Sequence, residues 1–412
     1  MTTLLDLPTE LVYKILSGLA EPNPGPYRFR FEDAKPSFNT ERVNQSLSTM
    51  AKVCRTSRTL RDLVEPLLYE FVYIPDATAK PLLSLLRCWK SRPHCAGYAR
   101  RFTAETKWAA GGTPPQVIDK KDVAFISEIA KHLKVYLRET WHEYTWNTDI
   151  LIELAMFQAH RIQSIELEFC QRRGIYRPAF ESLLPELGNT THISFPSLDY
   201  LYVLQAGLRA GELDHVLERA PNLSKLRLFM CDFNYPSQTL PANLTSLCIF
   251  QCVIAPSRLE TIISSMEKLS RLECTIWRGQ PEDLARVITS LSKHAKTLKS
   301  LTVSFRWNRR PGSSRVKVPL EALTSLESLT TDVRSFGFGG TGLVQSLPAS
   351  LSKLRIIRSP ETTKDELACF YTELCAARTR GREDLRVLLS GPEYWEELDS
   401  DHDTVFDGSM LF

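Results

Sequence analysis

The sequence predicts an α/β fold in which a small N-terminal helical module precedes a curved solenoid, with parallel strands on its concave face and helices on its convex face. Two observations lead to this prediction. Apolar residues recur at helical spacing within residues 4–19 and 47–68. Further along the chain, a short leucine pattern recurs eight times at intervals of 21 to 36 residues. Repetition on this scale is the signature of stacked structural repeats.

Composition narrows the class of protein before any motif is considered. The 412 residues include 51 basic and 48 acidic side chains, for a net charge of +3. So small an excess supplies no concentrated field for a phosphate backbone, and we expect no nucleic-acid partner. No stretch approaches the roughly 18 apolar residues of a membrane span, and the start of the chain has no basic signal region. We therefore expect no membrane partner and a cytoplasmic and/or nuclear location.

The helical module begins with LLDLPTELVYKILSGL at residues 4–19. Pro8 suits the first turn of a helix, where its missing N–H costs nothing. The apolar residues that follow are expected to form one stripe: Leu11, Val12, Ile15, Leu16 and Leu19. The second apolar pattern, at 47–68, predicts two or three short helices, with Pro66 interrupting the last.

These two segments carry a family resemblance. DLPTELVYKILSGL followed by LSTMAKVCRTSRTLRDLVEPLLYEFVYI resembles the two halves of an F-box of the kind common in fungal proteins. The resemblance implies that residues 1–75 bind the adaptor subunit of an SCF-type cullin-RING ubiquitin ligase, and through it the cullin. The residues implied to contact the adaptor are Leu7, Pro8, Leu11, Ile15, Val53, Cys54, Leu60 and Leu63.

The size of the module also favours binding to the adaptor, because so small a helical unit can hardly bury all its apolar residues alone. In the alternative, the same leucines pack this module against the repeats behind it. The sequence departs from the family at residues 21–46, where a short connection is usual. Four prolines and mixed charge predict that this insertion is a surface loop.

The repeating body is expected over residues 161–390. The pattern L-x-x-L-x-L, or a close variant, starts at residues 162, 198, 223, 244, 269, 298, 326 and 351. In a short strand the leucines at positions 4 and 6 point inward, while positions 3, 5 and 7 point outward. Amphipathic stretches at 258–269 and 283–298 predict helices of the convex side. The body resembles the ribonuclease-inhibitor-like class of leucine-rich repeats.

Two regions flank the repeats. Residues 76–160 are expected to be a helical linker, with a degenerate first repeat at Arg101–Ala104 and a loop at 109–116. An aromatic group in this linker, expected in the core or alternatively at a ligand site, comprises Trp141, Tyr144, Trp146 and Phe157. Residues 391–412 form an acidic tail, either a solvated end or cap, or a docking segment for a basic partner.

No residue pattern predicts catalysis, a cofactor or a metal. The ten cysteines include no C-x-x-C pair, and no histidine lies in a metalloprotease or triad motif. Cys248 and Cys252 are expected at outward and buried positions of one repeat, where they cannot chelate together. DSDHD at 399–403 resembles the start of a calcium loop but lacks its glycine and its final glutamate.

These features predict a substrate-recognition subunit of an SCF-type ubiquitin ligase, with the module binding the adaptor and the solenoid binding an unidentified target protein. Six residues at outward strand positions are predicted to bind that target: Tyr200, Tyr202, Arg227, Phe229, Phe250 and Arg271. Aromatic and arginine side chains dominate protein interfaces, although aromatics also favour strands in general. The alternative function is a protein-interaction scaffold outside any ligase.

Overall fold

The computed structural model has an α/β fold and forms two compact units. The first comprises residues 1–201 with 219–221, and the second residues 202–218 with 222–412. The residues that the structure describes are 7–20, 40–74, 78–106, 118–135, 137, 147–169, 194–205, 213–233, 240–277, 281–306, 318–332, 346–357, 368, 370, 372, 384–390 and 404–405.

The first unit opens with three helices, α1 (Thr9–Ala20), α2 (Thr40–Thr56) and α3 (Arg58–Glu70). Their shared core consists of Val12, Leu16, Met50, Val64 and Leu67. The N-terminus of α3 is capped because the Ser57 hydroxyl accepts a hydrogen bond from the Leu60 amide at 3.0 Å. The predicted helical module is therefore present.

Two details of the module differ from the prediction. Pro66 lies inside α3 without interrupting it. Proline has no amide hydrogen for the carbonyl of Asp62, one turn earlier, but Asp62 is an exposed residue. The α2 helix begins at Thr40, within the predicted surface loop. It begins early because Val43, buried with Met50, extends the apolar period. Residues 21–39 of that loop lie outside the described part of the chain.

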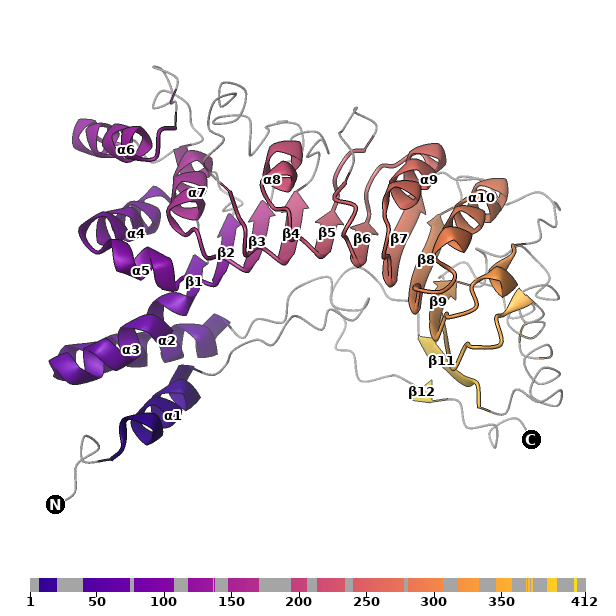
Figure 1. Ribbon diagram of the computed structural model, residues 1–412, viewed down its shortest axis with the longest axis horizontal. Coiled ribbons are helices and arrows are strands. Elements are labelled where there is room, and N and C mark those ends of the chain that lie inside the picture. The colour runs from indigo at the N-terminus through magenta and orange to yellow at the C-terminus, as the bar shows by residue number, and fades with distance from the viewer. Residues whose placement is uncertain are drawn as a thin grey trace. The chain divides into compact units, whose positions relative to one another are not determined.

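The remainder of the first unit alternates strands and helices (Figure 1). In chain order these are β1 (Phe71–Ile74), α4 (Ala79–Ser91), α5 (Pro93–Tyr98), β2 (Arg101–Thr106), α6 (Lys120–His132), α7 (Asn147–Gln158) and β3 (Ser164–Phe169). Strands β1, β2 and β3 pair in parallel and in sequence order. The predicted first repeat at 101–104 is thus preceded by another strand, β1, which the sequence had assigned to the helical module.

The second unit repeats this alternation. Its strands are β5 (Lys225–Phe229), β6 (Ser246–Phe250), β7 (Arg271–Trp277), β8 (Ser300–Arg306), β9 (Ser328–Asp332), β10 (Lys353–Ile357), β11 (Arg386–Ser390) and β12 (Thr404–Val405). Strand β4 (Tyr200–Gln205) contains the boundary between the units. Neighbours from β5 to β11 pair in parallel, and only β12, among the described strands, is antiparallel.

The leucine pattern coincides with these strands. Each of the eight motif starts is followed two residues later by the first residue of a strand, from Ser164 in β3 to Lys353 in β10. Within the second unit, position 4 of each motif pairs with position 4 of the next, through Leu226, Leu247, Leu272, Leu301, Leu329 and Leu354. These leucines are buried, which confirms the inward orientation predicted for them.

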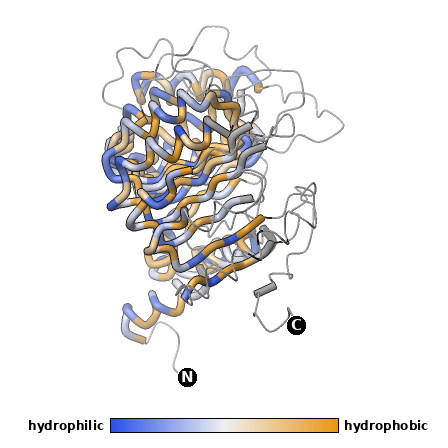
Figure 2. The backbone as a smooth tube through the Cα atoms, turned by 90° about the vertical axis from the view of Figure 1, so that its right-hand side faces the viewer, coloured by the Kyte–Doolittle hydropathy of each residue, from blue (hydrophilic) through white to orange (hydrophobic). Residues whose placement is uncertain are grey.

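Helices connect several of these strands. They are α8 (Asp214–Glu218), α9 (Pro256–Ser265) and α10 (Pro281–Leu291), and Figure 1 shows all three on the same side of the second unit's strands. Figure 2 shows hydrophilic and hydrophobic residues interleaved along the described chain. None of the described helices is long and apolar enough to cross a membrane.

Three sequence predictions fall outside the described residues. They concern most of the aromatic group of the linker, at 141–146, the loop at 109–116 and the calcium-like segment at 399–403. Phe157, the remaining aromatic of the group, is half-buried and stacks on Phe195 with a centroid distance of 6.0 Å. Of the acidic tail, Thr404 and Val405 are described and form β12 beside β11.

Candidate functional site

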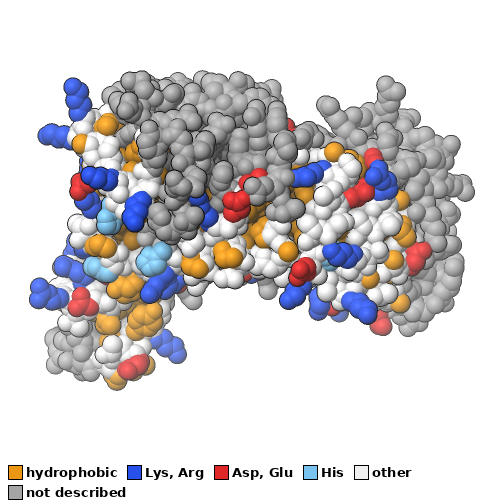
Figure 3. All heavy atoms as spheres, turned by 45° about the horizontal axis from the view of Figure 1, so that its top comes forward, with side chains coloured by type: hydrophobic (Ala, Val, Ile, Leu, Met, Phe, Trp, Pro, Cys, Tyr) orange, Lys and Arg blue, Asp and Glu red, His pale blue; other side chains and the backbone are white. Residues whose placement is uncertain are grey.

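The outer face of α1 carries exposed apolar side chains. Leu11 and Ile15 are 49% and 47% exposed, and Leu7, just before the helix, is 36% exposed. Val12 and Leu16, each 2% exposed, point into the module core. The predicted single apolar stripe is therefore partly buried in the core, at Val12 and Leu16, and partly exposed, at Leu11 and Ile15. Figure 3 shows hydrophobic side chains at the surface of the lobe formed by α1 to α3, at lower left.

The other predicted adaptor contacts are more enclosed. Pro8 is exposed beside Leu7, whereas Val53, Cys54, Leu60 and Leu63 are half-buried and pack against the module core. Burial raises the pKa of the Cys54 thiol, and the nearby Glu65 carboxylate raises it further. The α2 and α3 residues thus support the core, while α1 offers the apolar surface.

The predicted target-binding aromatics are mostly not available at the surface. Tyr202, Phe229 and Phe250 are 1%, 6% and 4% exposed. Their rings pack on one another, with centroid distances of 5.4 Å for Tyr202–Phe229 and 5.1 Å for Phe229–Phe250. Phe229 and Phe250 lie opposite each other on neighbouring strands, which are about 4.8 Å apart, and the Tyr202 ring packs against Phe229. The three rings therefore cover one another and, contrary to the prediction, are not exposed to a partner. Tyr200, in the first unit, is half-buried.

The two predicted arginines share a carboxylate that the sequence analysis did not select. Arg227 Nη2 lies 3.3 Å from Glu273 Oε2, and Arg271 Nε donates to Glu273 Oε1 at 2.6 Å. The side chains of Arg227 and Glu273 are 12% and 7% exposed, whereas that of Arg271 is 50% exposed. Arg227 is therefore committed to the sheet, and Arg271 keeps surface for a partner. Glu273 occupies motif position 5 of β7, which is an outward position, and this position could have identified it as a site residue.

Cys248 occupies the β6 position between Arg227 and Glu273. It is buried at this motif position 5, which was predicted to point outward. Burial, followed by the negative charge of Glu273, raises the pKa of its thiol well above the ordinary value. Cys252 is also buried, as predicted, and its Sγ donates to the Leu228 carbonyl at 3.3 Å. The Cys248 thiol is therefore a protonated packing group near neutral pH, and Cys252 packs in the core of the same repeat.

A polar cluster joins α3 to the start of α5. The Glu65 carboxylate forms an ion pair with Arg92 and lies 3.1 Å from His94 Nε2. Burial and the Glu65 charge raise the pKa of Cys95 to about 12. The ligand atoms of Glu65, His94 and Cys95 lie within 4.8 Å of one another, a spacing that suits a metal ion. However, Arg92 places a positive charge on the same carboxylate, which disfavours a further cation. We assign the cluster a structural role.

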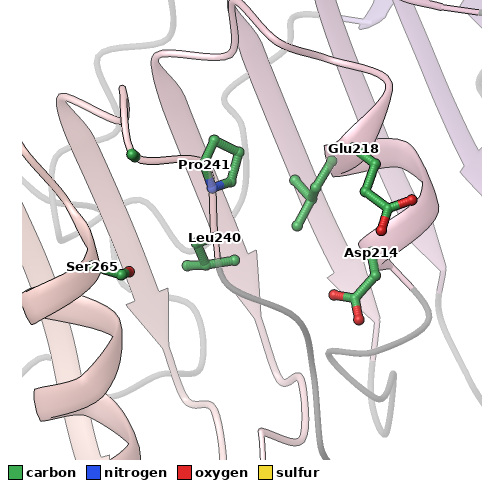
Figure 4. A pocket seen from close by; sticks show the side chains of 7 residues that line it. Asp214, Glu218, Leu240, Pro241 and Ser265 are labelled. Atoms are coloured by element: carbon green, nitrogen blue, oxygen red, sulfur yellow. The ribbon is translucent and has the colours of Figure 1, made fainter.

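A cavity of about 300 Å³ lies in the second unit between α8, the 240–242 segment and the end of α9 (Figure 4). Its wall contains Asp214 and Glu218, one helical turn apart on α8, together with Leu240 and Pro241. The cavity joins two carboxylates to a short apolar wall, and neither a basic group nor a nucleophilic thiol is among its lining residues. It offers no catalytic arrangement.

Comparisons with known proteins do not add a family. No model of a known protein family matches the chain, and no curated protein matches its sequence.

Proposed function

We propose that the chain is the substrate-recognition subunit of an SCF-type cullin-RING ubiquitin ligase. The F-box-like module binds the adaptor subunit, which links the chain to the cullin, and the leucine-rich-repeat-like body binds the target protein. The chain itself performs no chemistry in this proposal. Its contribution is proximity, because it holds the target near the subunits that transfer ubiquitin.

The apolar surface of α1 carries the adaptor half of the proposal. Leu11 and Ile15 lie on an arc of α1 that the module core leaves uncovered, and Leu7 is exposed just before the helix. Exposed apolar side chains grouped on one short helix, next to a packed core, are typical of a surface that becomes buried in a complex. All three are also among the eight residues that the F-box resemblance assigns to the adaptor.

The target half needs a revised surface. Because Tyr202, Phe229 and Phe250 pack on one another, they stabilise the strands and do not serve as contact residues. Arg271 keeps its place in the proposed surface, since half of its side chain is exposed. Arg227 contributes indirectly by holding Glu273, which in turn orients Arg271.

The experiment is an affinity capture of the purified chain by the adaptor subunit. The test variant is Leu11→Ala with Ile15→Ala, which removes exposed apolar atoms and leaves Val12 and Leu16 in the core. Val253→Ala is the matched control, because Val253 is 51% exposed and belongs to the second unit.

We expect the adaptor to capture the wild type and the Val253→Ala variant, and to lose the double variant. Failure of the folded wild type to bind the adaptor would reject the ligase role. In that case the scaffold function would be favoured, with the body binding a partner for structural reasons.

A further inference from the structure

The outward face of the second unit has an uneven charge. Because β5 to β11 pair in register, motif position 3 of every strand lies in one row. The row consists of Lys225, Ser246, Arg271, Ser300, Ser328, Lys353 and Arg386. All four basic residues are exposed, the three serines are half-buried, and no acidic residue belongs to the row. We call these seven residues the basic row.

The neighbouring row, at motif position 5, does not cancel this charge. It contains Arg227 and Arg355, and its one acidic residue is Glu273. Glu273 is nearly enclosed between Arg227 and Arg271, so its charge is already neutralised within the sheet. Positions 3 and 5 of these strands together hold six basic residues against one acidic residue, in a chain whose overall charges nearly balance.

We infer that the basic row binds an acidic, extended segment of another protein. Lysine and arginine side chains bind carboxylates, and serine hydroxyls between them can donate hydrogen bonds to the remaining carboxylate oxygens. This inference deepens the target-binding half of the proposed function, because it names the chemical class of the target segment.

The dimensions suit a peptide of ordinary length. Seven strands with spacings of about 4.8 Å span about 29 Å, which about nine extended residues would cover. A phosphate backbone is the competing polyanion. It is disfavoured because the whole chain carries a net charge of only +3, which provides little long-range attraction for a nucleic acid.

The test measures binding of a fluorescent peptide of about nine residues, rich in Asp and Glu, to the full chain without the adaptor. The test variant is Lys353→Gln with Arg386→Gln. Its matched control is Lys268→Gln with Lys296→Gln, which removes the same charge from exposed residues outside the strands of the second unit. An oligonucleotide of the same net charge is the second probe. Because the adaptor is absent, failure here is distinct from failure of adaptor binding.

We expect the peptide to bind, to be released by salt, and to lose up to about fivefold in affinity for each charge removed from the basic row. The control variant should retain wild-type affinity. Equal weakening by both variants, or tighter binding of the oligonucleotide than of the peptide, would overturn the inference.

The chain's own tail is the remaining acidic candidate, with seven acidic residues and no Lys or Arg after residue 390. Neutralising Glu393, Glu396 and Glu397 to Gln in the full chain separates this source from a partner. If the row binds a partner segment, the neutralised chain binds the peptide as the wild type does. Peptide binding that is seen only after neutralisation would assign the row to the tail and overturn the inference.

Discussion

Val12 and Ile15 lie three residues apart on α1, yet Val12 is buried in the module core and nearly half of Ile15 is exposed. At about 100° per residue, the positions of Leu11, Ile15, Val12 and Leu16 cover an arc of about 140°. The core covers only the part of this arc that contains Val12 and Leu16. One helix therefore has an apolar face that packs in the core and an adjacent apolar face that the core leaves exposed.

This division predicts opposite outcomes for two leucine substitutions on the same helix. Leu16→Ala should lower the free energy of unfolding by about 2–5 kcal/mol, because it leaves a cavity in the core. Leu11→Ala should change it by less than about 0.5 kcal/mol, because Leu11 is half exposed and lies outside the module core. Urea unfolding of both variants measures the difference. Equal losses of stability would show that Leu11 is a core residue.

The Arg227–Glu273–Arg271 cluster predicts unequal costs for its members. Glu273→Gln should destabilise the second unit by about 3–5 kcal/mol, since it leaves the enclosed Arg227 charge without its carboxylate. Arg271→Gln should cost less than about 1 kcal/mol, because the Arg271 side chain is half exposed and its ion pair is screened by water. Thermal unfolding of the two variants provides the test, and the reverse order of stabilities would contradict the cluster as described.

Glu65 should stabilise the first unit through its contacts with Arg92 and His94. Glu65→Gln removes the charge that pairs with Arg92 and lies beside His94, so we expect a loss of about 1–3 kcal/mol. Glu70→Gln is the matched control, because Glu70 is exposed near the end of the same helix. Urea unfolding should separate the two variants. If they are equally stable, the cluster does not hold α3 to α5.

Buried thiols predict a loss of stability at alkaline pH. Burial raises the pKa of both Cys95 and Cys274 to about 12, from an ordinary value of 9.0. On raising the pH, the unfolded chain releases these protons first, so stability is complete below about pH 9 and is lost between about pH 9 and pH 12. The urea midpoint should therefore be lower at about pH 10 than at about pH 8. A variant with Cys95→Ala and Cys274→Ala should show a smaller fall. An identical fall would assign the effect to other groups.

Much of the second unit could be predicted from the sequence, because the leucine pattern specifies both the position of each strand and its buried residues. Each of the eight motif starts leads to a strand. Strand β11 escaped prediction because its register with β10 places Asp384 where the pattern has its first leucine. Strand β1 escaped because Phe71–Ile74 follows a helical pattern directly, and a four-residue apolar run does not distinguish strand from helix.

The candidate surfaces were harder to predict, because burial depends on neighbours that lie far away in the sequence. The alternation of a strand predicted that Phe229 and Phe250 point away from the leucine core. It could not predict that rings from adjacent strands would enclose each other. Glu273 was not chosen as a site residue for a related reason, since its ion pair is with Arg227, which is two strands away. On α1, periodicity identified the apolar residues but not which of them the core would cover.

Titration calorimetry of the adaptor subunit into the chain tests the central claim most directly. Burying the exposed half of a Leu or Ile side chain contributes about 1 kcal/mol, so the Leu11→Ala, Ile15→Ala variant should bind about 30-fold more weakly than the wild type. The Val253→Ala variant should bind like the wild type, and all three chains should unfold at the same temperature. Equal adaptor affinity of the wild type and the double variant would contradict binding through α1.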